Sequence, residues 1–434
     1  MSPNVVLAHG VGRVYESPIP LSAYLLGAAA TVLVSFAVAS LRTGDVLARG
    51  ERQIAGARVA RIGGVALGGV ALLLLIAGLV AGLVVSSEGF TFTTLAFWVG
   101  LIVGVTALCA LIGGLWELAD PWARIERFYR LEEAQAGSTR VPWWVGPLLL
   151  YGLFWFELVS DAGFQDRWVF TVVLSYSIFV FAMRSQLGDS WREVDPLSIL
   201  FGFASRCAPL RVSAEGVFYK GPVRDLLAMS PMPKSLFASI LVLLASTTLD
   251  NVTETVAWTT LRSDLGIAGV SDILVDSVAL LTFTVPFLVT FSAAIWVAQR
   301  WIATERPFAD VARIFGWSLV PIGVAYVLAH NSPLLMTGLP QLLRAMSDPF
   351  GMGWNLLGTA SLFEGFSPSP QLVWFLEIVF IVSGHIIGVL AAHHTAVRLA
   401  ATRSDAAKSQ YALTMLMSVY TIATLWLLSQ PLVA

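Results

Sequence analysis

Long apolar runs alternate with short polar segments along the whole chain. Apolar runs of about 20 residues recur, which is the length that an α-helix needs to cross the hydrocarbon core of a bilayer. The pattern predicts an all-α, polytopic transmembrane bundle that forms one integral membrane domain over residues 1–434. We place its ten spans at 19–41, 62–85, 92–116, 142–160, 168–184, 235–258, 273–299, 311–331, 371–397 and 410–432.

Lys and Arg are concentrated in every second segment between these runs. The segments 42–61, 117–141, 184–234, 300–313 and 398–409 hold 22 of the 26 basic residues. The segments between them hold only Arg13, Arg167, Arg262 and Arg344. Because basic loops near membrane crossings stay in the cytoplasm, this alternation predicts the direction of every span. We expect a multi-pass protein of a bacterial plasma (inner) membrane, with the N-terminus and the C-terminus both outside.

Two loops are long enough to have structure of their own. In the predicted cytoplasmic loop 185–234, Asp195-Pro196 is typical of a helix start, and the short apolar helix that follows is expected to lie at the membrane surface. We expect Arg192, Arg206 and Arg211 at the level of the lipid headgroups. The predicted outer loop 332–370 contains a turn-forming, aromatic stretch at 347–354, which favours either a lid over the outer face or a plain connector. The first run, 19–41, is too long for the core of a signal peptide, so we expect a retained helix.

Composition narrows the range of functions. The chain is 57% hydrophobic and 12% charged, and its formal net charge is −2, so it offers no basic surface to nucleic acid. It contains no P-loop, GxSxG or HExxH motif. Cys109 lies in a predicted span and Cys207 in a predicted cytoplasmic loop, which argues against a disulfide between them. Two halves of five helices each would have opposite orientations, as in many transporters, but no self-similarity of sequence supports such a repeat.

Ionisable residues within the predicted spans are the main candidates for function. A charge in hydrocarbon costs at least roughly 2.5 kcal/mol, so such residues usually have a partner or a task. A rise of about 1.5 Å per residue places seven of them in one layer near the outer surface. The layer is formed by His9, Glu157, Asp250, Glu254, Asp276, His330 and Glu377. Histidines and carboxylates together suit zinc or another divalent metal, although pairing at wet helix ends would also explain some of them.

The ninth predicted span carries three further histidines. His385 lies past the midpoint of the helix, and His393 lies about 12 Å deeper, so one metal ion cannot bind both. They are candidates for haem ligands or for steps of a proton relay. For His393 and His394, an interfacial position facing the headgroups is the alternative.

Four passages together resemble a known family. They are 8–20, 249–258, 348–354 and the pair Gly384-His385 with Ala392-His393. They are similar to a family of bacterial multi-pass membrane proteins in which some members carry the name fenitrothion hydrolase, a membrane-associated organophosphate hydrolase. The resemblance spans nearly the whole chain, although its motifs are not a recognised catalytic signature.

The resemblance implies hydrolysis of a phosphotriester, with a second subunit as partner, and it singles out His9, Asp250, His330 and His385. A divalent metal would supply the chemistry by acidifying its bound water and polarising the P=O group. This hypothesis makes His9, Asp250, His330 and His385 metal ligands, with Asp250 and Glu254 catalytic. Glu157, Asp276 and Glu377 would then contact a small apolar or polar substrate. A secondary transporter or proton-handling permease, and a haem- or quinone-binding subunit, are the alternatives.

Overall fold

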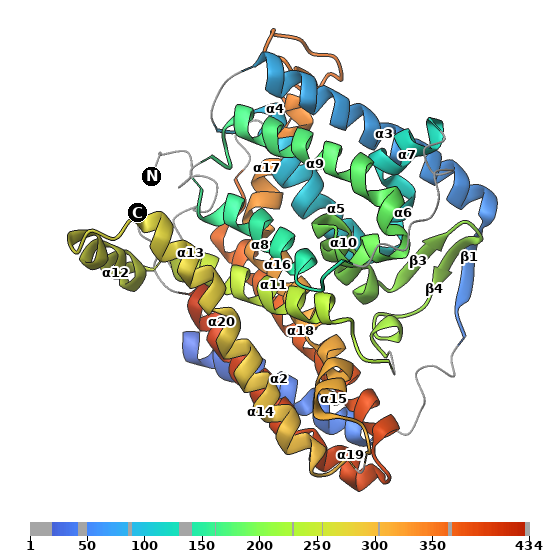
Figure 1. The fold of residues 1–434 in the computed structure, drawn as a ribbon, viewed down its shortest axis with the longest axis vertical. Coiled ribbons are helices and arrows are strands. Elements are labelled where there is room, and N and C mark those ends of the chain that lie inside the picture. The colour runs from blue at the N-terminus through green and yellow to red at the C-terminus, as the bar shows by residue number, and fades with distance from the viewer. Residues whose placement is uncertain are drawn as a thin grey trace. The chain divides into compact units, whose positions relative to one another are not determined.

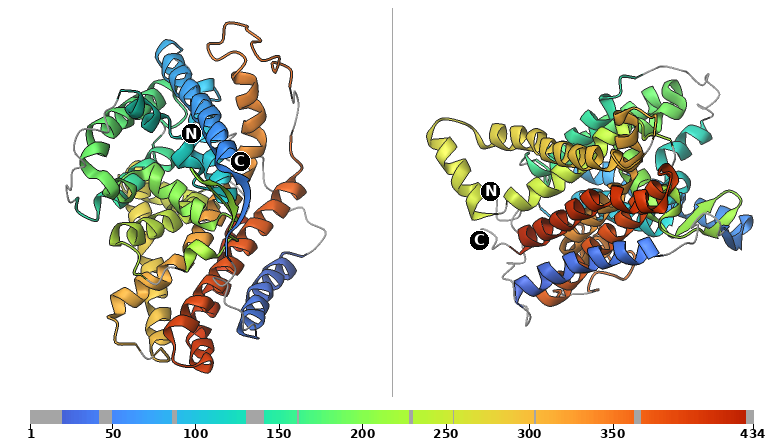
Figure 2. Two further views of the ribbon diagram at one scale, coloured as in Figure 1. Left: turned by 90° about the vertical axis from the view of Figure 1, so that its right-hand side faces the viewer. Right: turned by 90° about the horizontal axis from the view of Figure 1, so that it is seen from below.

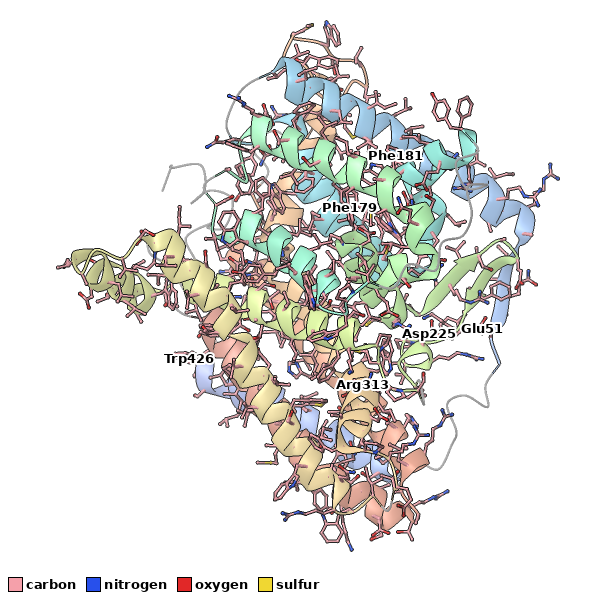
Figure 3. The ribbon with its side chains drawn as sticks, viewed as in Figure 1. Glu51, Phe179, Phe181, Asp225, Arg313 and Trp426 are labelled. Carbon is pink, nitrogen blue, oxygen red and sulfur yellow. The ribbon has the colours of Figure 1, made fainter. Side chains whose placement is uncertain are left out.

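The computed structural model is predominantly helical and describes residues 20–41, 50–85, 89–129, 141–160, 162–227, 230–253, 255–302, 304–362 and 367–429. Eight of its described helical segments are long and apolar enough to cross a membrane. One of these segments, α9 (Asp166–Leu187), carries the exposed Phe181, and the last helix, α20 (Tyr411–Leu428), carries the exposed Trp426 (Figure 3). Because water-soluble surfaces rarely display so many large apolar residues, the helices indicate a membrane location. Helices occupy all ten predicted ranges, but the number that cross the bilayer stays a prediction.

The chain folds into two compact units. Unit 1 comprises Glu51–Lys220 and Pro333–Pro368, and unit 2 comprises the first helix with Gly221–Ser332 and Ser369–Ala434. The elements of unit 1 are β1 (Arg52–Gly56), α3 (Ala57–Val84), α4 (Phe92–Leu95), η2 (Ala96–Gly104), α5 (Val105–Leu111), β2 (Ile112–Gly113), α6 (Leu115–Ala119), α7 (Pro121–Phe128), α8 (Val145–Leu158), α9 (Asp166–Leu187), η4 (Gly188–Glu193), α10 (Pro196–Cys207), β3 (Leu210–Ser213), β4 (Gly216–Tyr219) and most of α17 (Ser332–Ala345).

The elements of unit 2 are α2 (Leu21–Leu41), η5 (Arg224–Leu226), α11 (Lys234–Thr253), α12 (Val256–Ile267), α13 (Asp272–Thr282), α14 (Thr284–Gln299), α15 (Phe308–Phe315), η6 (Gly316–Ser318), α16 (Val320–His330), α18 (Pro370–Leu399), α19 (Arg403–Ser409) and α20 (Tyr411–Leu428). Figure 1 shows α14 and α20 side by side, and Figure 2 shows α2 running beside the C-terminal helices. The first helix of the chain therefore packs with the last ones, through a cluster of Ala28, Ala329, Ile381 and Leu425.

Unit 1 contains a small sheet that the helical prediction missed. Its strand order is β1-β4-β3-β2, with β1 and β3 antiparallel to β4 and β2 parallel to β3. The strands are two to five residues long, too short to produce a clear alternation in the sequence. β1 pairs with β4, and Arg211 forms an ion pair with Glu51 at 2.6 Å. These contacts join parts of the two predicted cytoplasmic loops, 42–61 and 185–234.

Helix α10 forms where the sequence predicted, and its expected place at the membrane surface stays a prediction. Asp195 caps it by accepting from the backbone N–H groups of Leu197 and Ser198. Most of its residues are buried, among them Phe201 and Phe203. One face stays partly exposed, formed by Ser198, Gly202, Ser205 and Arg206. Of the three arginines expected at the headgroups, Arg192 pairs with Glu117 and Arg211 pairs with Glu51.

The predicted outer loop 332–370 also differs from expectation, because its first part is α17. Leu334 and Leu342 of this helix belong to the core of unit 1, and a Cβ atom on Gly338 would meet Val99 at 2.6 Å. Val99 belongs to η2, a π-helical stretch in the middle of a predicted span. After α17, the Asp348 carboxylate accepts from the N–H groups of Met352 and Gly353, which closes a tight turn.

Candidate functional site

Two helices of unit 2 bring Asp250 and His330 into direct contact. Asp250 lies in the last turn of α11 and His330 is the last residue of α16, and the two helices pack against each other. The Nε2 atom of His330 and Oδ2 of Asp250 form a close ion-pair contact. Both residues are buried, 8% and 6% exposed. The two residues that the sequence placed at one depth therefore meet, and the outer polar site that they were predicted to form stays a prediction.

Asn251 and Tyr326 orient this pair. The Asn251 side-chain nitrogen lies 2.8 Å from the carbonyl oxygen of Thr247 and 3.1 Å from the Tyr326 hydroxyl. A carbonyl can only accept, so the NH₂ group must face it and the amide oxygen must face the other way. That oxygen lies 3.3 Å from Nδ1 of His330, which therefore carries a hydrogen and donates it. Asn251 belongs to the polar stretch 247–254, whose Thr and Asn side chains the sequence suggests as partners of the Asp250 carboxylate. The sequence analysis missed Tyr326, which stands four residues before His330 on the same helix face.

The remaining members of the predicted outer layer have other surroundings. Asp276 of α13 accepts from Trp258 Nε1 at 3.0 Å and pairs with Arg262 at 3.5 Å, which also contacts Asp272 at 2.9 Å. The indole and the guanidinium satisfy this buried carboxylate, and its role in substrate binding stays a prediction. Glu157 is half-buried in α8 of unit 1. Glu377 of α18 is fully buried, and His9 and Glu254 lie outside the described residues.

The histidines of α18 face the interior of unit 2. His385 is 2% exposed, and its Nδ1 lies 2.8 Å from the carbonyl oxygen of Ile381. His393 is buried against Phe36, with ring centroids 6.1 Å apart, and its depth in the bilayer stays a prediction. His394 is half-buried beside it. Nε2 of His385 and Nδ1 of His393 are buried and have no hydrogen-bond partner within the described ranges.

The predicted metal site is not assembled by the residues that the structure describes. Among them, no three His, Cys, Asp or Glu side chains lie close enough together to hold a metal ion. Asp250 and His330 meet, but His385 does not complete a ligand group with them, because it belongs to a deeper turn of α18. His9, the fourth predicted ligand, lies outside the described residues, so a metal centre and haem both stay predictions.

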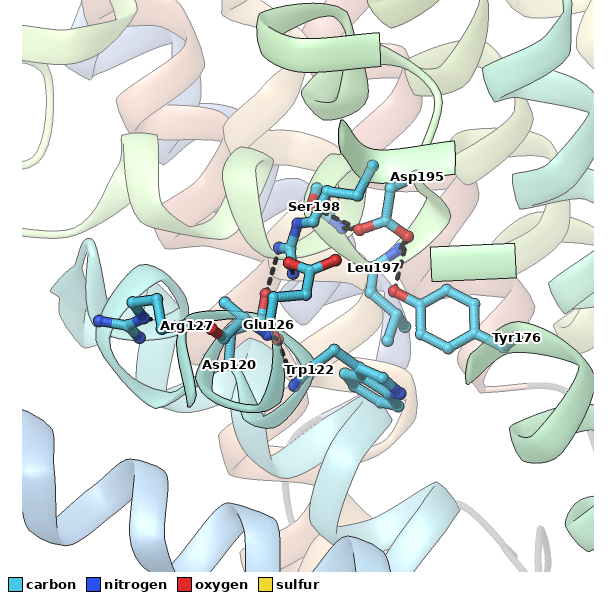
Figure 4. A network of polar contacts seen from close by, with 10 residues as sticks. Asp120, Trp122, Glu126, Arg127, Tyr176, Asp195, Leu197 and Ser198 are labelled. Carbon is cyan, nitrogen blue, oxygen red and sulfur yellow. Dashed lines mark hydrogen bonds and ion pairs between the residues drawn. The ribbon is translucent and has the colours of Figure 1, made fainter. Parts of the chain in front are cut away.

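Unit 1 holds a second buried polar network that the sequence analysis did not select (Figure 4). Arg184 of α9 pairs with Asp120, and with Glu126 at 3.4 Å. Asp195 accepts from the Tyr176 hydroxyl at 2.8 Å and from Ser198, and burial raises the pKa of its carboxyl. Asp120 and Asp195 each precede a proline and cap a helix; the sequence analysis noted this signal at Asp195 and missed it at Asp120. Helix capping and ion pairing therefore give these buried side chains structural roles.

Comparison with protein-family models, with curated proteins and with solved structures finds no match.

Proposed function

We propose that the protein is a proton-coupled membrane permease and that Asp250 and His330 form its proton-binding pair. The observation that carries the proposal is a buried imidazole and carboxylate in contact inside a bundle of apolar helices. Ionisable residues within membrane helices are costly, and they commonly mark the paths of protons and ions.

The hydrogen bonds around the pair define how many protons it exchanges. Nδ1–H of His330 donates to the amide oxygen of Asn251, so the proton that the pair can gain or lose is the one between Nε2 of His330 and Oδ2 of Asp250. With that proton the pair is neutral overall, and without it the pair carries one negative charge. The two forms differ in the free energy of burial, because an uncompensated charge is far more expensive in an apolar interior than a neutral pair. Loading one proton therefore favours a closed, dehydrated site.

Interrupted helices in unit 2 support transport. The span Phe308–His330 contains the 3₁₀ turn η6 between α15 and α16, and the span Asp272–Gln299 is divided at Phe283. Discontinuous helices near buried ionisable groups are a recurring feature of secondary transporters. They give a bundle places at which segments can move relative to one another.

The hydrolase hypothesis has less support from the described residues. It requires a divalent metal with at least three protein ligands, and no such group is present among those residues. The Asp250–His330 pair by itself supplies proton binding without a metal. Phosphotriester hydrolysis stays a prediction of the resemblance.

A pH step on reconstituted protein tests the proposal. Protein in liposomes adsorbed to a solid-supported electrode should displace charge when the outside pH changes, and Asp250→Asn should reduce the displaced charge at least tenfold, because the amide cannot share the proton. Asp272→Asn, which alters an exposed carboxylate of the same unit, is the matched control. Thermal melting and size-exclusion elution check that each variant is folded.

Two results would overturn the proposal. One is an undiminished displacement in folded Asp250→Asn. The other is absence of displacement in the wild type together with organophosphate hydrolysis that a chelator abolishes and a divalent ion restores, which would favour the hydrolase.

A further inference from the structure

Two exposed tryptophans at the end of α14 each carry a cation on the ring face. The guanidinium carbon of Arg300 lies 3.7 Å from the ring centroid of Trp296. Nζ of Lys408, which belongs to α19, lies 4.9 Å from the ring centroid of Trp301. The two tryptophans are 55% and 43% exposed, and a cation within about 6 Å of a ring centroid is attracted to the negative ring face. We call Trp296, Arg300, Trp301 and Lys408 the Trp–cation patch.

An exposed apolar stripe of α14 leads to this patch. Val285, Val289 and Trp296 are exposed, and with about 3.6 residues per turn they lie within about 40° of one another around the helix. Arg300 continues the same face one turn later. Helix α14 belongs to a segment that is long and apolar enough to cross a membrane. An apolar stripe that ends in tryptophan and then in a cation is the order found where hydrocarbon gives way to lipid headgroups.

Helix α19 brings the second cation from a different part of the chain. It packs against α14, and Figure 1 shows it beside the last turns of that helix. At the start of α19, the Thr402 hydroxyl donates to the Asp405 carboxylate at 2.7 Å and accepts from the Asp405 backbone N–H. After α14, the side-chain nitrogen of Gln299 donates to the Arg306 carbonyl at 3.3 Å. Local hydrogen bonds therefore hold the backbone on both sides of the patch.

Positive charge dominates this end of unit 2. The segments 300–313 and 398–409 together hold six basic and three acidic residues, an excess of three positive charges. One of the three carboxylates, Asp310, pairs within its own helix. Within the described ranges, neither Arg300 nor Lys408 forms an ion pair with a carboxylate of the chain. Both cations are therefore available to an anion from outside the chain.

The patch matches the parts of a phospholipid in their order. The apolar stripe suits acyl chains, the tryptophan rings suit the boundary of the hydrocarbon, and the cations suit a phosphate. The guanidinium of Arg300 can bind phosphate with two parallel N–H groups, and the ammonium of Lys408 adds a point charge. Basic residues next to a membrane crossing recognise the anionic lipids of the cytoplasmic leaflet. An acidic peptide would use the charges but leave the apolar stripe without a partner.

We propose that the Trp–cation patch binds the phosphate headgroup of an anionic phospholipid, with the acyl chains along the exposed stripe of α14. Arg300 and Lys408 attract the headgroup from two different segments of unit 2. Because the tryptophan rings already restrict both cations, less side-chain entropy is lost when the lipid binds. This inference goes beyond the proposed function and does not rest on it.

Native mass spectrometry of the detergent-purified protein measures this binding. Dioleoyl phosphatidylglycerol should bind more tightly than dioleoyl phosphatidylcholine, whose headgroup has no net charge, and glycerol phosphate at equal concentration should not compete. A basic residue near an anionic lipid surface contributes about fivefold in affinity, so Arg300→Gln/Lys408→Gln should bind phosphatidylglycerol about 25-fold more weakly. Arg52→Gln/Arg58→Gln, which removes two exposed arginines of unit 1, is the matched control and should keep the wild-type affinity.

Removing the rings distinguishes the patch from charge alone. Trp296→Leu/Trp301→Leu keeps both cations and should still weaken the binding of phosphatidylglycerol. Trp168→Leu, which replaces an exposed tryptophan of α9, should not. Thermal melting and size-exclusion elution check that each variant is folded.

Four results would overturn the lipid site. The first needs no variant: equal affinity of the wild-type protein for the two lipids, or full competition by glycerol phosphate. The second is an equal loss of affinity in the matched arginine control, and the third is unchanged binding in folded Trp296→Leu/Trp301→Leu. The fourth is a protein dimer that disappears in Arg300→Gln/Lys408→Gln, which would assign the patch to a second copy of the chain.

Discussion

At the scale of single residues, Asn251 determines the protonation pattern of the buried pair. Its amide connects Thr247 and Tyr326 on one side with His330 on the other. The sequence placed Asp250 and His330 at one depth, but it gave no indication of which neighbour holds the imidazole. That choice depends on how α11 and α16 are rotated against each other, which only packing decides.

Asn251→Leu should lower the stability of the protein by about 1–3 kcal/mol, because it leaves Nδ1–H of His330 and the Tyr326 hydroxyl without this partner. Thermal unfolding in detergent measures the change. Thr248→Ala, three residues away on the same helix and half-buried, should change the melting temperature much less. Equal stability of Asn251→Leu and Thr248→Ala would contradict the assigned network.

Arg184 is the cation that the structure shows beside Asp120 and Glu126 in unit 1. Removing one partner of a buried ion pair typically costs about 3–5 kcal/mol, so Arg184→Ala should be strongly destabilising. Arg167→Ala, an exposed arginine of the same helix, is the control. Equal melting temperatures of Arg184→Ala and Arg167→Ala would refute this account.

At the scale of elements, α18 is shaped by its glycines. Gly384 and Gly388 let α16 approach so closely that a Cβ atom on either would contact backbone oxygen at 2.6 Å or 2.8 Å. The chain contains many glycine pairs of this spacing, and spacing alone does not distinguish them. The positions that require glycine become known only when the partner helix is in place.

Gly384→Ala should destabilise the protein by about 1–3 kcal/mol through overpacking against Ala325 and Pro321. Gly78→Ala in α3, where a Cβ would have nothing within 4 Å, should be neutral or slightly stabilising because alanine favours helix. Melting temperatures and the folded fraction in size-exclusion chromatography compare the two. If both substitutions behave alike, the close contact of α16 with α18 is wrong.

At the scale of the whole molecule, the division into units differs from two halves of five predicted spans each. Helix α2 belongs to unit 2, where Tyr24 packs on Trp374 with ring centroids 6.0 Å apart, and most of α17 belongs to unit 1. Each unit therefore combines helices that are distant in sequence. This division also removes the simple repeat that an inverted five-helix arrangement would require.

The predicted topology can be tested with introduced cysteines. Ala214→Cys in the turn between β3 and β4 should resist a membrane-impermeant maleimide in intact cells, and Ala360→Cys after α17 should react, since both positions are exposed. The two native cysteines should not react with the maleimide, because both are buried. Burial also raises the pKa of Cys207 to about 12, so almost no thiolate forms near pH 7. Labelling at 214 without labelling at 360 would reverse the assigned orientation.

The sequence by itself determined the class of protein, the positions of the helices and the shared depth of Asp250 and His330. These follow from local quantities: the length of apolar runs, the capping residues and the rise per residue. Only the tertiary structure decided the burial of α10, the pairing of short strands, the pairing of Asp276 with Arg262 and the packing of α2 against α18. Each of these depends on contacts between segments far apart in the chain. A hydrophobic pattern indicates that a face is buried, but it does not indicate which segment covers that face.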